Sequence, residues 1–322
     1  MIKKITFWLQ CSRAFALPIT ILSWLVVFVY GLINGGDILN GILALIGVSF
    51  AHLAGNMADD YIDYGILSKD EKLMNSAVAT KCCFVRDGSI TLKDLAKMIA
   101  VFCFIAILIG IILFFRSGFG VFWLMLVGGI LTLTYAKFSL VGLSEVIIGL
   151  LFGPLMFEGV WYVMKGSYSV DVLILSLSVV MFTVAFLYIH TLLDFDCDKI
   201  SHKKTLCCRI NDKNKALILF VVFVALGYSF AVLFGIKNSN YWIFSSLLTI
   251  PFACYIYRQM KRYNSNQDLV PEIKWWNYPL DNWDAIKQEG TESFYFILFQ
   301  ARNLMMWVCL IVLVAMFLNH NL

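Results

Sequence analysis

Long apolar runs separated by short polar segments make up most of the chain. Each run is about twenty residues long, which is the length of an α-helix that crosses the hydrocarbon core of a bilayer. We expect transmembrane helices at residues 14–33, 38–58, 95–115, 119–136, 140–164, 170–193, 216–236, 241–257 and 294–318. The pattern therefore predicts an all-α, polytopic membrane protein with nine transmembrane helices.

The composition agrees with this prediction. The chain has 322 residues, of which 61% are hydrophobic and 14% are charged, and its mean hydropathy is +0.81. The formal net charge of +4 is ordinary for a membrane protein and gives no reason to expect a nucleic-acid partner. No obligate protein partner is indicated either.

The positions of the basic residues predict the orientation, because Lys and Arg collect on the cytoplasmic side of a membrane. The loops expected outside hold only Arg116, Lys165 and Lys237. Most other basic residues lie near the N-terminus and in three polar segments, residues 59–94, 194–215 and 258–293. We therefore expect the N-terminus and these segments on the cytoplasmic side of a bacterial-type inner membrane, with the segments as loops that cap a site.

Two groups of polar side chains follow apolar helices. Asn56, Asp60 and Asp63 are spaced i, i+4 and i+7, and Asp194 and Asp198 are spaced i and i+4, so each group lies on one helix face. Carboxylates this close either take up protons or bind a cation, and such oxygen ligands suit Mg²⁺. Because substrate phosphates usually complete a Mg²⁺ site of this kind, both groups predict a phosphorylated substrate.

A histidine precedes each group by one turn: His52 comes before Asn56, and His190 comes before Asp194. These polar stripes belong to the second and sixth expected helices. We interpret them as an internal repeat whose two halves face one another across a central cavity.

Further polar residues near the inner boundary are candidates for binding. Glu145 lies close to this boundary with Tyr135 and Lys137 within reach. Lys203 and Lys204 follow the second acidic group and could meet the charge of a phosphate, although anchoring on the positive inner side would also explain them.

Several features leave two interpretations open. Arg13 is either a topology anchor or a substrate ligand, and Arg302 inside the last helix needs a carboxylate partner or an anionic ligand. The aromatic segment 272–283 is an interfacial anchor or a lid. The adjacent pairs Cys82-Cys83 and Cys207-Cys208 lack the spacing of zinc or redox motifs, so we expect reduced thiols.

With these residues in view, the chain resembles the UbiA superfamily of intramembrane prenyltransferases. The resemblance rests on the nine expected helices, the N-x-x-x-D-x-x-D pattern at residues 56–63 and the D-x-x-x-D pattern at residues 194–198. Within the superfamily the chain is most similar to the branch that prenylates 1,4-dihydroxy-2-naphthoate in menaquinone biosynthesis. That similarity is carried by Arg13 with Leu17-Pro18, by the run from Asn56 to Tyr64, by Gly142-Leu143-Ser144-Glu145, and by Asp194-x-x-x-Asp198 followed by Lys203-Lys204-Thr205-Leu206. The chain departs from the branch at Asp59, His190-Thr191, Leu193 and His202, and in the position of Asp70. None of these departures removes an aspartate from the two acidic patterns.

The resemblance implies one transmembrane prenyltransferase domain over residues 1–322, with its helices around a central cavity. It implies Mg²⁺-dependent transfer of a polyprenyl group from an isoprenyl diphosphate to an aromatic acceptor, in contact with membrane lipid. Two Mg²⁺ ions would be held by Asn56, Asp60, Asp63, Asp194 and Asp198. Glu145 or His190 would accept a proton from the acceptor. Substrate contacts would come from Arg13, Asn56, Tyr64, Arg86, Tyr135, Lys137, Lys203 and Lys204.

Other functions remain as alternatives. The same superfamily includes enzymes that prenylate hydroxybenzoate, heme or other lipid-quinone precursors. CDP-alcohol phosphotransferases also use membrane aspartates, but their D-G-x-x-A-R signature is missing from the sequence. A transporter would carry its coupling acids near the bilayer midplane, whereas these acids are expected at helix ends.

Overall fold

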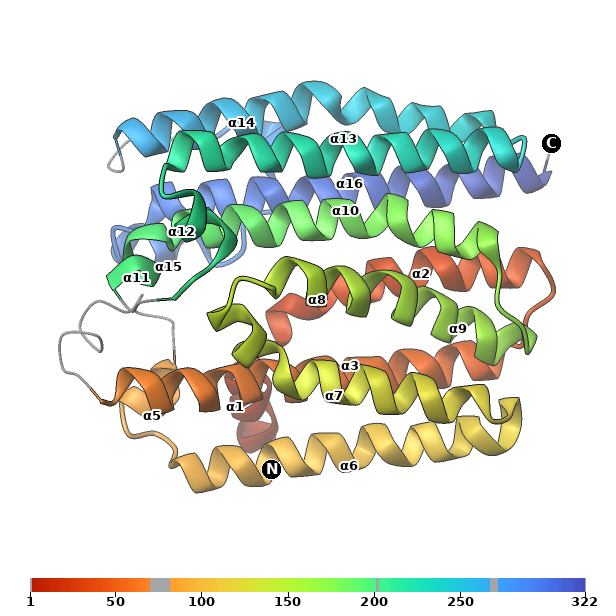
Figure 1. The fold of residues 1–322 in the computed structure, drawn as a ribbon, viewed down its shortest axis with the longest axis horizontal. Helices are drawn as coiled ribbons and strands as arrows, with labels where there is room; N and C mark the ends of the chain where they lie inside the picture. The colour runs from red at the N-terminus through yellow and green to blue at the C-terminus, as the bar shows by residue number, and fades with distance from the viewer. Residues whose placement is uncertain (1, 70–81, 201–202, 267–271, 322) are drawn as a thin grey trace. The chain divides into compact units, whose positions relative to one another are not determined.

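The protein is helical throughout the part of the chain that the computed structural model describes, which is residues 2–69, 82–200, 203–266 and 272–321 (Figure 1). Eight helices are long and apolar enough to cross a membrane. They are Ala14–Ile33, Ile38–Leu67, Leu92–Ser117, Gly120–Leu140, Ser144–Lys165, Val170–Leu193, Lys213–Lys237 and Glu292–Asn321. The predicted all-α membrane architecture is confirmed, but these residues give eight such helices rather than the expected nine.

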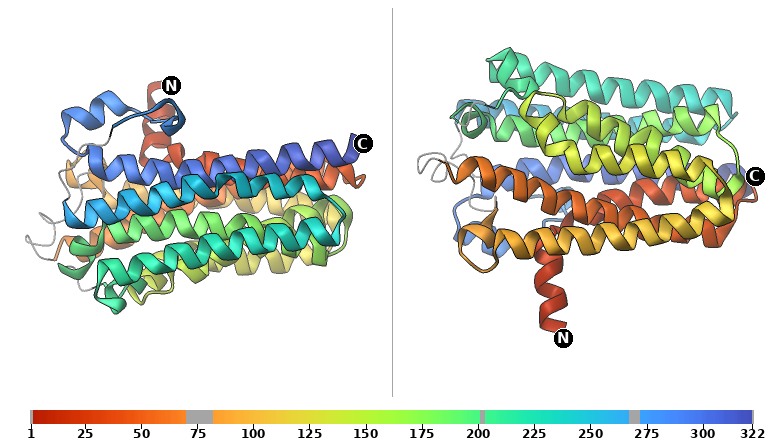
Figure 2. Two further views of the ribbon diagram at one scale, coloured as in Figure 1. Left: turned by 90° about the horizontal axis from the view of Figure 1, so that it is seen from above. Right: turned by 60° about the horizontal axis from the view of Figure 1, so that its bottom comes forward.

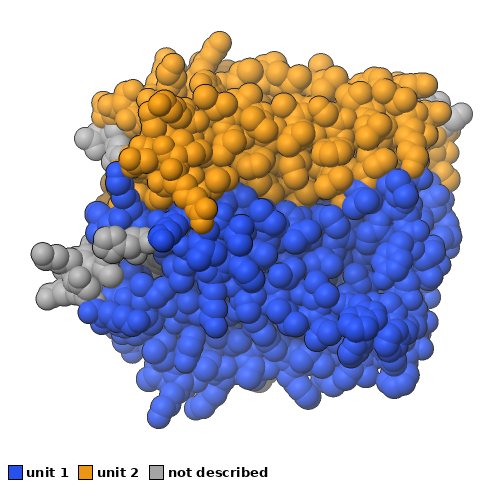
Figure 3. Space-filling model, viewed as in Figure 1, with its two compact units in different colours: residues 1–173, 197–205 blue, residues 174–196, 206–322 orange. Residues whose placement is uncertain are grey.

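The chain forms two compact units (Figure 3). Unit 1 contains Met1–Leu173 and Cys197–Thr205, and unit 2 contains Ile174–Asp196 and Leu206–Leu322. The chain therefore passes between the units three times: within helix α10 (Val170–Leu193), within helix α11 (Phe195–Ile200), and between Thr205 and Leu206.

Unit 1 is built around one long helix, α3. Its helices are α1 (Ile2–Cys11), η1 (Ala14–Ala16), α2 (Leu17–Ile33), α3 (Ile38–Leu67), α5 (Cys83–Arg86), α6 (Leu92–Ser117), α7 (Gly120–Leu140), α8 (Ser144–Leu150), η2 (Leu151–Leu155) and α9 (Met156–Lys165). Helix α3 packs against α2, α6, α7 and α9. Helix α1 runs across the direction of these long helices (Figure 2).

Helices α2 and α3 approach closely because a glycine faces α2 near the start of α3. A Cβ atom on Gly41 would lie 2.5 Å from the ring of Phe28. The indole Nε1 of Trp24 donates a hydrogen bond to the Gly41 carbonyl at 2.9 Å. This contact fixes the α2–α3 pair that carries several of the predicted site residues.

Helix α3 extends beyond the span expected at residues 38–58. It continues to Leu67, so the first part of the predicted loop 59–94 is helical. The extension follows from the helical spacing of Asp60 and Asp63, whose 8% and 3% exposure places them on a buried face. The apolar run alone ends too early to show this continuation. Parts of the three predicted loops, residues 70–81, 201–202 and 267–271, lie outside the described residues.

The span expected at 140–164 is interrupted. Helix α8 passes into a π-helical turn, Leu151–Leu155, before α9 begins at Met156. Gly153 has φ −101° and ψ −109°, outside the helical range, and Pro154 has no N–H for the hydrogen-bond ladder. The two residues together explain the break.

Unit 2 packs α13 and α16 against a 3₁₀ segment. Its elements beyond α10 are α12 (Leu206–Ile210), α13 (Lys213–Lys237), η3 (Tyr241–Thr249), α14 (Ile250–Ser265), η4 (Trp275–Asn277), α15 (Trp283–Gln288) and α16 (Glu292–Asn321). The expected span 241–257 is divided between η3 and the first half of α14. Because α14 also carries Arg258, Lys261 and Arg262, neither piece has the length and hydropathy of a continuous span. The basic half of α14 lies in the segment that the sequence predicted as a loop from residue 258.

The aromatic segment is fastened to α16 by buried amides. Asn277 donates to the Gln300 side chain at 2.8 Å, and Gln300 and Asn303 donate back to the Asn277 carbonyl at 3.0 and 2.9 Å. Arg302 forms an ion pair with Asp281, so the predicted carboxylate partner of Arg302 is confirmed. These contacts favour a fixed anchor over a lid.

Candidate functional site

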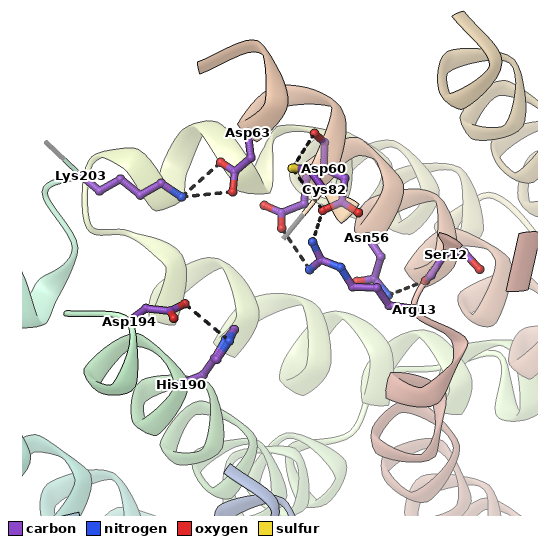
Figure 4. Close-up of polar contacts among 10 residues, drawn as sticks. Ser12, Arg13, Asn56, Asp60, Asp63, Cys82, His190, Asp194 and Lys203 are labelled. Carbon is purple, nitrogen blue, oxygen red and sulfur yellow. Dashed lines mark hydrogen bonds and ion pairs between the residues drawn. The ribbon is translucent and has the colours of Figure 1, made fainter. Parts of the chain in front are cut away.

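The first acidic group lies on α3 and is bound by an arginine from unit 1 (Figure 4). Arg13 donates to Asp59 at 3.3 Å and forms a second ion pair with Asp60. Asn56 donates to the carbonyl of Ser12 at 3.0 Å. The segment before α2 is therefore attached to α3 by a neutral hydrogen bond at Ser12 and by the ion pairs of Arg13.

Arg13 has an unusual backbone conformation. Its φ of 54° and ψ of 45° lie in the left-handed region that non-glycine residues rarely adopt. Burial lowers the pKa of Arg13, but the neighbouring Asp60 and Asp59 carboxylates outweigh this effect and raise it above the ordinary value. Arg13 therefore stays positively charged at every pH at which the protein is folded.

The second cation in this region is Lys203, which reaches Asp63. Its Nζ lies 3.1 and 3.2 Å from the two carboxylate oxygens, and the two side chains are 9% and 3% exposed. Removing one member of such a buried ion pair leaves an uncompensated charge, which strongly lowers the free energy of unfolding. The sequence had placed Lys203 beside the acids, and the structure identifies Asp63 as its partner.

Lys203 also connects the second acidic pattern to α3 within unit 1. Its backbone N–H donates to the Asp198 carbonyl at 2.9 Å, and that of Lys204 donates to the Leu140 carbonyl at 3.0 Å. Asp198 is itself buried, at 5% exposure. The end of the second pattern is thus held close to Asp63 on the first.

Asp194, the other member of the second pattern, belongs to unit 2. The Nε2 atom of His190 lies 3.6 Å from its Oδ2 atom, one helical turn away (Figure 4). The Oδ1 atom is buried, and the described residues offer it no hydrogen-bond partner. Asp196, between the two pattern residues, is 61% exposed and pairs with Lys213 at 2.6 Å. Asp194 and Asp196, two residues apart in the sequence, thus have different surroundings.

Glu145 begins helix α8 and is buried at 5% exposure. Ser144 donates to its Oε2 at 2.9 Å, while Oε1 has no hydrogen-bond partner among the described residues. Lys137 is exposed on α7, and the described side chains show no ion pair between it and Glu145. The structure thus leaves one buried carboxylate oxygen of Glu145 available.

The remaining predicted site residues fall on several elements of unit 1. Tyr64 lies on α3, Tyr135 lies near the end of α7, and both are half-buried. Arg86 ends the short helix α5. Their roles in substrate binding stay predictions.

Sequence reasoning missed the contacts of Asp59 and of the cysteine pairs. Asp59 shares Arg13 with Asp60. The thiol of Cys82 donates to the Asp60 carbonyl at 3.4 Å, and that of Cys207 donates to the Thr191 carbonyl at 3.3 Å. Each pair therefore contacts the helix that carries an acidic group, and the only sequence signal was its position downstream of that group. All nine cysteines are free thiols in the structure.

The side chains fit Mg²⁺ in their chemistry but not as a gathered set. Among the described residues, no three His, Cys, Asp or Glu side chains are close enough together to hold a metal ion. Asp60 and Asp63 instead face basic side chains. The donors are nevertheless hard carboxylate oxygens, which suit Mg²⁺, and the buried Oδ1 of Asp194 still lacks a partner.

The fold and these side chains define a polytopic, integral membrane protein whose helices carry buried carboxylates paired with basic groups. Comparison with family models makes this class specific, since residues 13–278 match the model of the UbiA prenyltransferase family. The chain belongs to this family. The expected superfamily is confirmed, whereas the naphthoate branch stays a prediction. A comparison with curated proteins gives no significant match.

Solved structures share the fold over nearly the whole chain. A digeranylgeranylglyceryl phosphate synthase structure has 17% identity and a TM-score of 0.62, with 97% of this chain and 98% of that chain covered. A UbiA homologue from Aeropyrum pernix K1 has 16% identity and a TM-score of 0.63, with 93% and 97% covered. A UbiA homologue from Archaeoglobus fulgidus bound to DMAPP and Mg²⁺ has 13% identity and a TM-score of 0.58, with 92% and 98% covered. At these identities the likeness establishes the fold alone.

Proposed function

We propose that this protein transfers a polyprenyl group from an isoprenyl diphosphate to an aromatic acceptor in a Mg²⁺-dependent reaction. The observation that carries the proposal is that buried carboxylates on the membrane helix α3 form ion pairs with Arg13 and Lys203. Such alternating charges suit a substrate that carries a diphosphate and binds with metal ions. Family membership and the DMAPP and GPP bound to the Archaeoglobus fulgidus homologue support this choice of donor.

The two basic side chains have distinct tasks in this proposal. Arg13 and Lys203 neutralise Asp60 and Asp63 in the protein alone and bind the diphosphate oxygens when substrate enters. The forked guanidinium of Arg13 suits bidentate contact with phosphate, whereas the ammonium of Lys203 acts as a point charge. Both groups stabilise the negative charge that develops on the leaving diphosphate.

Metal binding falls to Asn56, Asp60, Asp63, Asp194 and Asp198. Two bound Mg²⁺ ions would act as Lewis acids toward the leaving diphosphate. We treat residues 1–322 as one functional prenyltransferase domain, as the family membership of residues 13–278 suggests.

The acceptor side of the reaction needs a group that accepts a proton. Glu145 has a buried oxygen without a partner among the described residues, and His190 is 43% exposed beside Asp194. Either can take a proton from an aromatic hydroxyl, which makes the ring more nucleophilic. Tyr64 and Tyr135 offer aromatic surface that keeps water away from the allylic carbon, and Arg86, Lys137 and Lys204 supply further positive charge.

We propose 1,4-dihydroxy-2-naphthoate as the acceptor, in menaquinone biosynthesis. The support is the likeness of Arg13-Ala14-Phe15-Ala16-Leu17-Pro18 and of Lys203-Lys204-Thr205-Leu206 to that branch. We also propose that the N-terminus and both acidic groups lie on the cytoplasmic side of an inner membrane, because the basic residues collect in the segments on that side. Hydroxybenzoate and heme are the competing acceptors.

One experiment tests the reaction and the acceptor together. Purified protein is incubated with Mg²⁺, geranyl or longer isoprenyl diphosphates and each of the three acceptors, and the products are identified by mass. We expect a prenylated naphthoate product that requires Mg²⁺. If the product is instead a prenylated hydroxybenzoate or heme, that compound is the acceptor and the assignment of the naphthoate is wrong. No transfer to any of the three acceptors would refute the proposal.

Asp194→Asn supplies the matching residue test. It should lower the rate of prenyl transfer by at least about a hundredfold, the scale on which lost electrostatic stabilisation acts, while insertion and folding remain intact. Asp196→Asn is the control, because that carboxylate is 61% exposed, pairs with Lys213 and belongs to neither acidic pattern. Equal activity in both variants would contradict the assignment of Asp194.

A further inference from the structure

A histidine lies deeper in helix α3 than the acidic group and is held by a threonine of α2. The Thr20 hydroxyl and the Nδ1 atom of His52 are 2.5 Å apart. Thr20 is 1% exposed and His52 is half-buried. The contact fixes the orientation of the imidazole ring. It also determines whether the other ring nitrogen, Nε2, is a hydrogen-bond donor or an acceptor.

His52 shares a helix face with the first acidic group. It precedes Asn56 by four residues, and it precedes Asp60 by eight residues, which corresponds to about 12 Å along the helix axis. The histidine therefore lies about two turns into the membrane from the carboxylate that contacts Arg13.

The surroundings of His52 retain unused hydrogen-bonding capacity. Its Nε2 atom has no hydrogen-bond partner among the described residues, and the side chain is half-buried rather than fully enclosed. Ser23 lies one turn beyond Thr20 on the same face of α2, and its buried Oγ atom has no described partner either. If the Thr20–His52 pair served only to join α2 to α3, the Nε2 atom of His52 and the Oγ atom of Ser23 would not both lack a hydrogen-bond partner.

An aromatic side chain and a helix break border the same histidine. The ring of Phe152 contacts the imidazole edge to face, with centroids 5.3 Å apart and planes at 89°. Phe152 belongs to the interrupted turn Leu151–Leu155, where Gly153 and Pro154 disturb the helix. Single turns of this wider kind are frequent at functional sites. Together the side chains offer an aromatic face beside a hydrogen-bonding group.

This chemistry distinguishes between the two substrates of the proposed reaction. A prenyl tail consists of hydrocarbon and cannot use an imidazole nitrogen or a hydroxyl group. An aromatic acceptor has a flat ring that can pack on Phe152 and polar ring substituents that can hydrogen-bond to His52. Polar side chains inside a bilayer are costly and are therefore usually functional.

We propose that His52, positioned by Thr20 and bordered by Phe152, recognises a hydroxyl or carbonyl substituent on the ring of the aromatic acceptor. The inference rests on the proposed prenyl transfer and concerns which residues select the acceptor. His52 is a specificity-determining residue, and Thr20 is the residue that positions it.

The test measures the KM of each substrate separately, with 1,4-dihydroxy-2-naphthoate and geranyl diphosphate as the probes. His52→Phe keeps a planar ring against Phe152 but removes both nitrogens. We expect the acceptor KM to rise roughly tenfold or more, the effect of one lost hydrogen bond in a buried site, with the KM for geranyl diphosphate changed less than about twofold. His52→Gln, which retains a hydrogen-bonding side chain, should recover part of the loss.

An acceptor analogue with one ring hydroxyl removed provides a second readout. The wild-type protein should discriminate against one such analogue, and His52→Phe should lose that discrimination because the group that reads the hydroxyl is gone. If His52→Phe fails to fold, Thr20→Val serves as the test variant, with a smaller rise in acceptor KM.

Thr249→Val is the matched control. Thr249 is also a buried threonine, hydrogen-bonded to Tyr228 at 2.7 Å in unit 2, and its loss should leave the acceptor KM unchanged. An equal rise in both KM values for His52→Phe, or a loss of thermal stability alone, would assign His52 a structural role and overturn the inference. Wild-type protein that transfers no prenyl group would instead refute the proposed function, and with it the inference.

Discussion

At the scale of single residues, the carboxylates of α3 are neutralised by cations from distant positions in the sequence. Arg13 lies 47 residues from Asp60 and Lys203 lies 140 residues from Asp63. A membrane helix cannot carry several buried negative charges without such partners, because the cost of desolvation is large. The same cations are then available to an anionic substrate.

Arg13→Gln separates these two tasks. Without the guanidinium, the isoprenyl diphosphate loses a bidentate partner, so its KM should rise about tenfold or more. Asp59 and Asp60 lose a competing cation, so the Mg²⁺ concentration for half-maximal rate should fall or stay constant. Steady-state kinetics at varied Mg²⁺ and substrate would measure both.

Arg13→Lys is the control for this experiment, since it keeps the charge but not the fork. It should show an intermediate KM and the wild-type Mg²⁺ requirement. A higher Mg²⁺ requirement in Arg13→Gln would mean that Arg13 supports metal binding instead of competing with it.

Lys203→Gln tests the cost of a buried charge. Asp63 is 3% exposed and would lose the ammonium group of Lys203, and breaking a buried pair of this kind costs about 3–5 kcal/mol. Lys213→Gln is the matched control, because its partner Asp196 is 61% exposed and such pairs contribute at most about 1 kcal/mol. Thermal unfolding in detergent, without Mg²⁺, should therefore show a large loss for Lys203→Gln and a small one for Lys213→Gln. Equal losses would show that burial does not govern the Lys203 pair.

At the scale of helices, the sequence predicts the apolar elements well and their ends and interruptions poorly. The spacing of Asp60 and Asp63 contains the information that α3 continues to Leu67, but hydropathy ends the span at residue 58. The break at Gly153 and the 3₁₀ segment Tyr241–Thr249 depend on how neighbouring helices replace lost backbone hydrogen bonds. Hydropathy does not contain that information.

The candidate site shows a similar division. Helical periodicity is enough to group Asn56, Asp60 and Asp63, since all three lie on one helix. It cannot find the Arg13 and Lys203 contacts, because these join residues that are far apart in the sequence and depend on tertiary packing. The role of Asp59 was missed for the same reason.

Two glycines of α3 allow a test of how tightly this helix must pack. A Cβ on Gly55 would lie 2.8 Å from the Thr132 methyl group on α7, whereas one on Gly65 would meet nothing within 4 Å. Gly55→Ala should therefore destabilise the protein by about 1–3 kcal/mol through overpacking, and should slow prenyl transfer because Asn56 is the next residue. Gly65→Ala should be neutral or stabilising by up to about 1 kcal/mol, owing to higher helix propensity.

Thermal unfolding and activity assays on the two variants would provide the comparison. Both variants exchange glycine for alanine on the same helix. A difference between them in stability or activity therefore reports the contact of residue 55 with Thr132 on α7. A Gly55→Ala variant as stable as Gly65→Ala would show that Thr132 moves aside at no cost.

At the scale of the whole molecule, the two acidic patterns belong to two compact units. Asp60, Asp63 and Asp198 lie in unit 1, and Asp194 lies in unit 2. The proposed metal ligands include all four aspartates, so a bound isoprenyl diphosphate should stabilise the folded state less when any one of them is replaced. This dependence distinguishes a metal-assisted diphosphate site from a simple anion site formed by basic side chains alone.

The prediction is a thermal shift that depends on Mg²⁺, substrate and Asp194 together. With geranyl diphosphate at about 100 times its Kd, mass action adds about 2.7 kcal/mol, which corresponds to several degrees in Tm for a protein of this size. Mg²⁺ alone or geranyl diphosphate alone should give a smaller shift, because the carboxylates and the diphosphate repel one another without the metal. Asp194→Asn should remove most of the combined shift, whereas Asp196→Asn should retain it. A full shift in Asp194→Asn would show that this carboxylate does not contribute to binding of the diphosphate with Mg²⁺, and would contradict its assignment as a metal ligand.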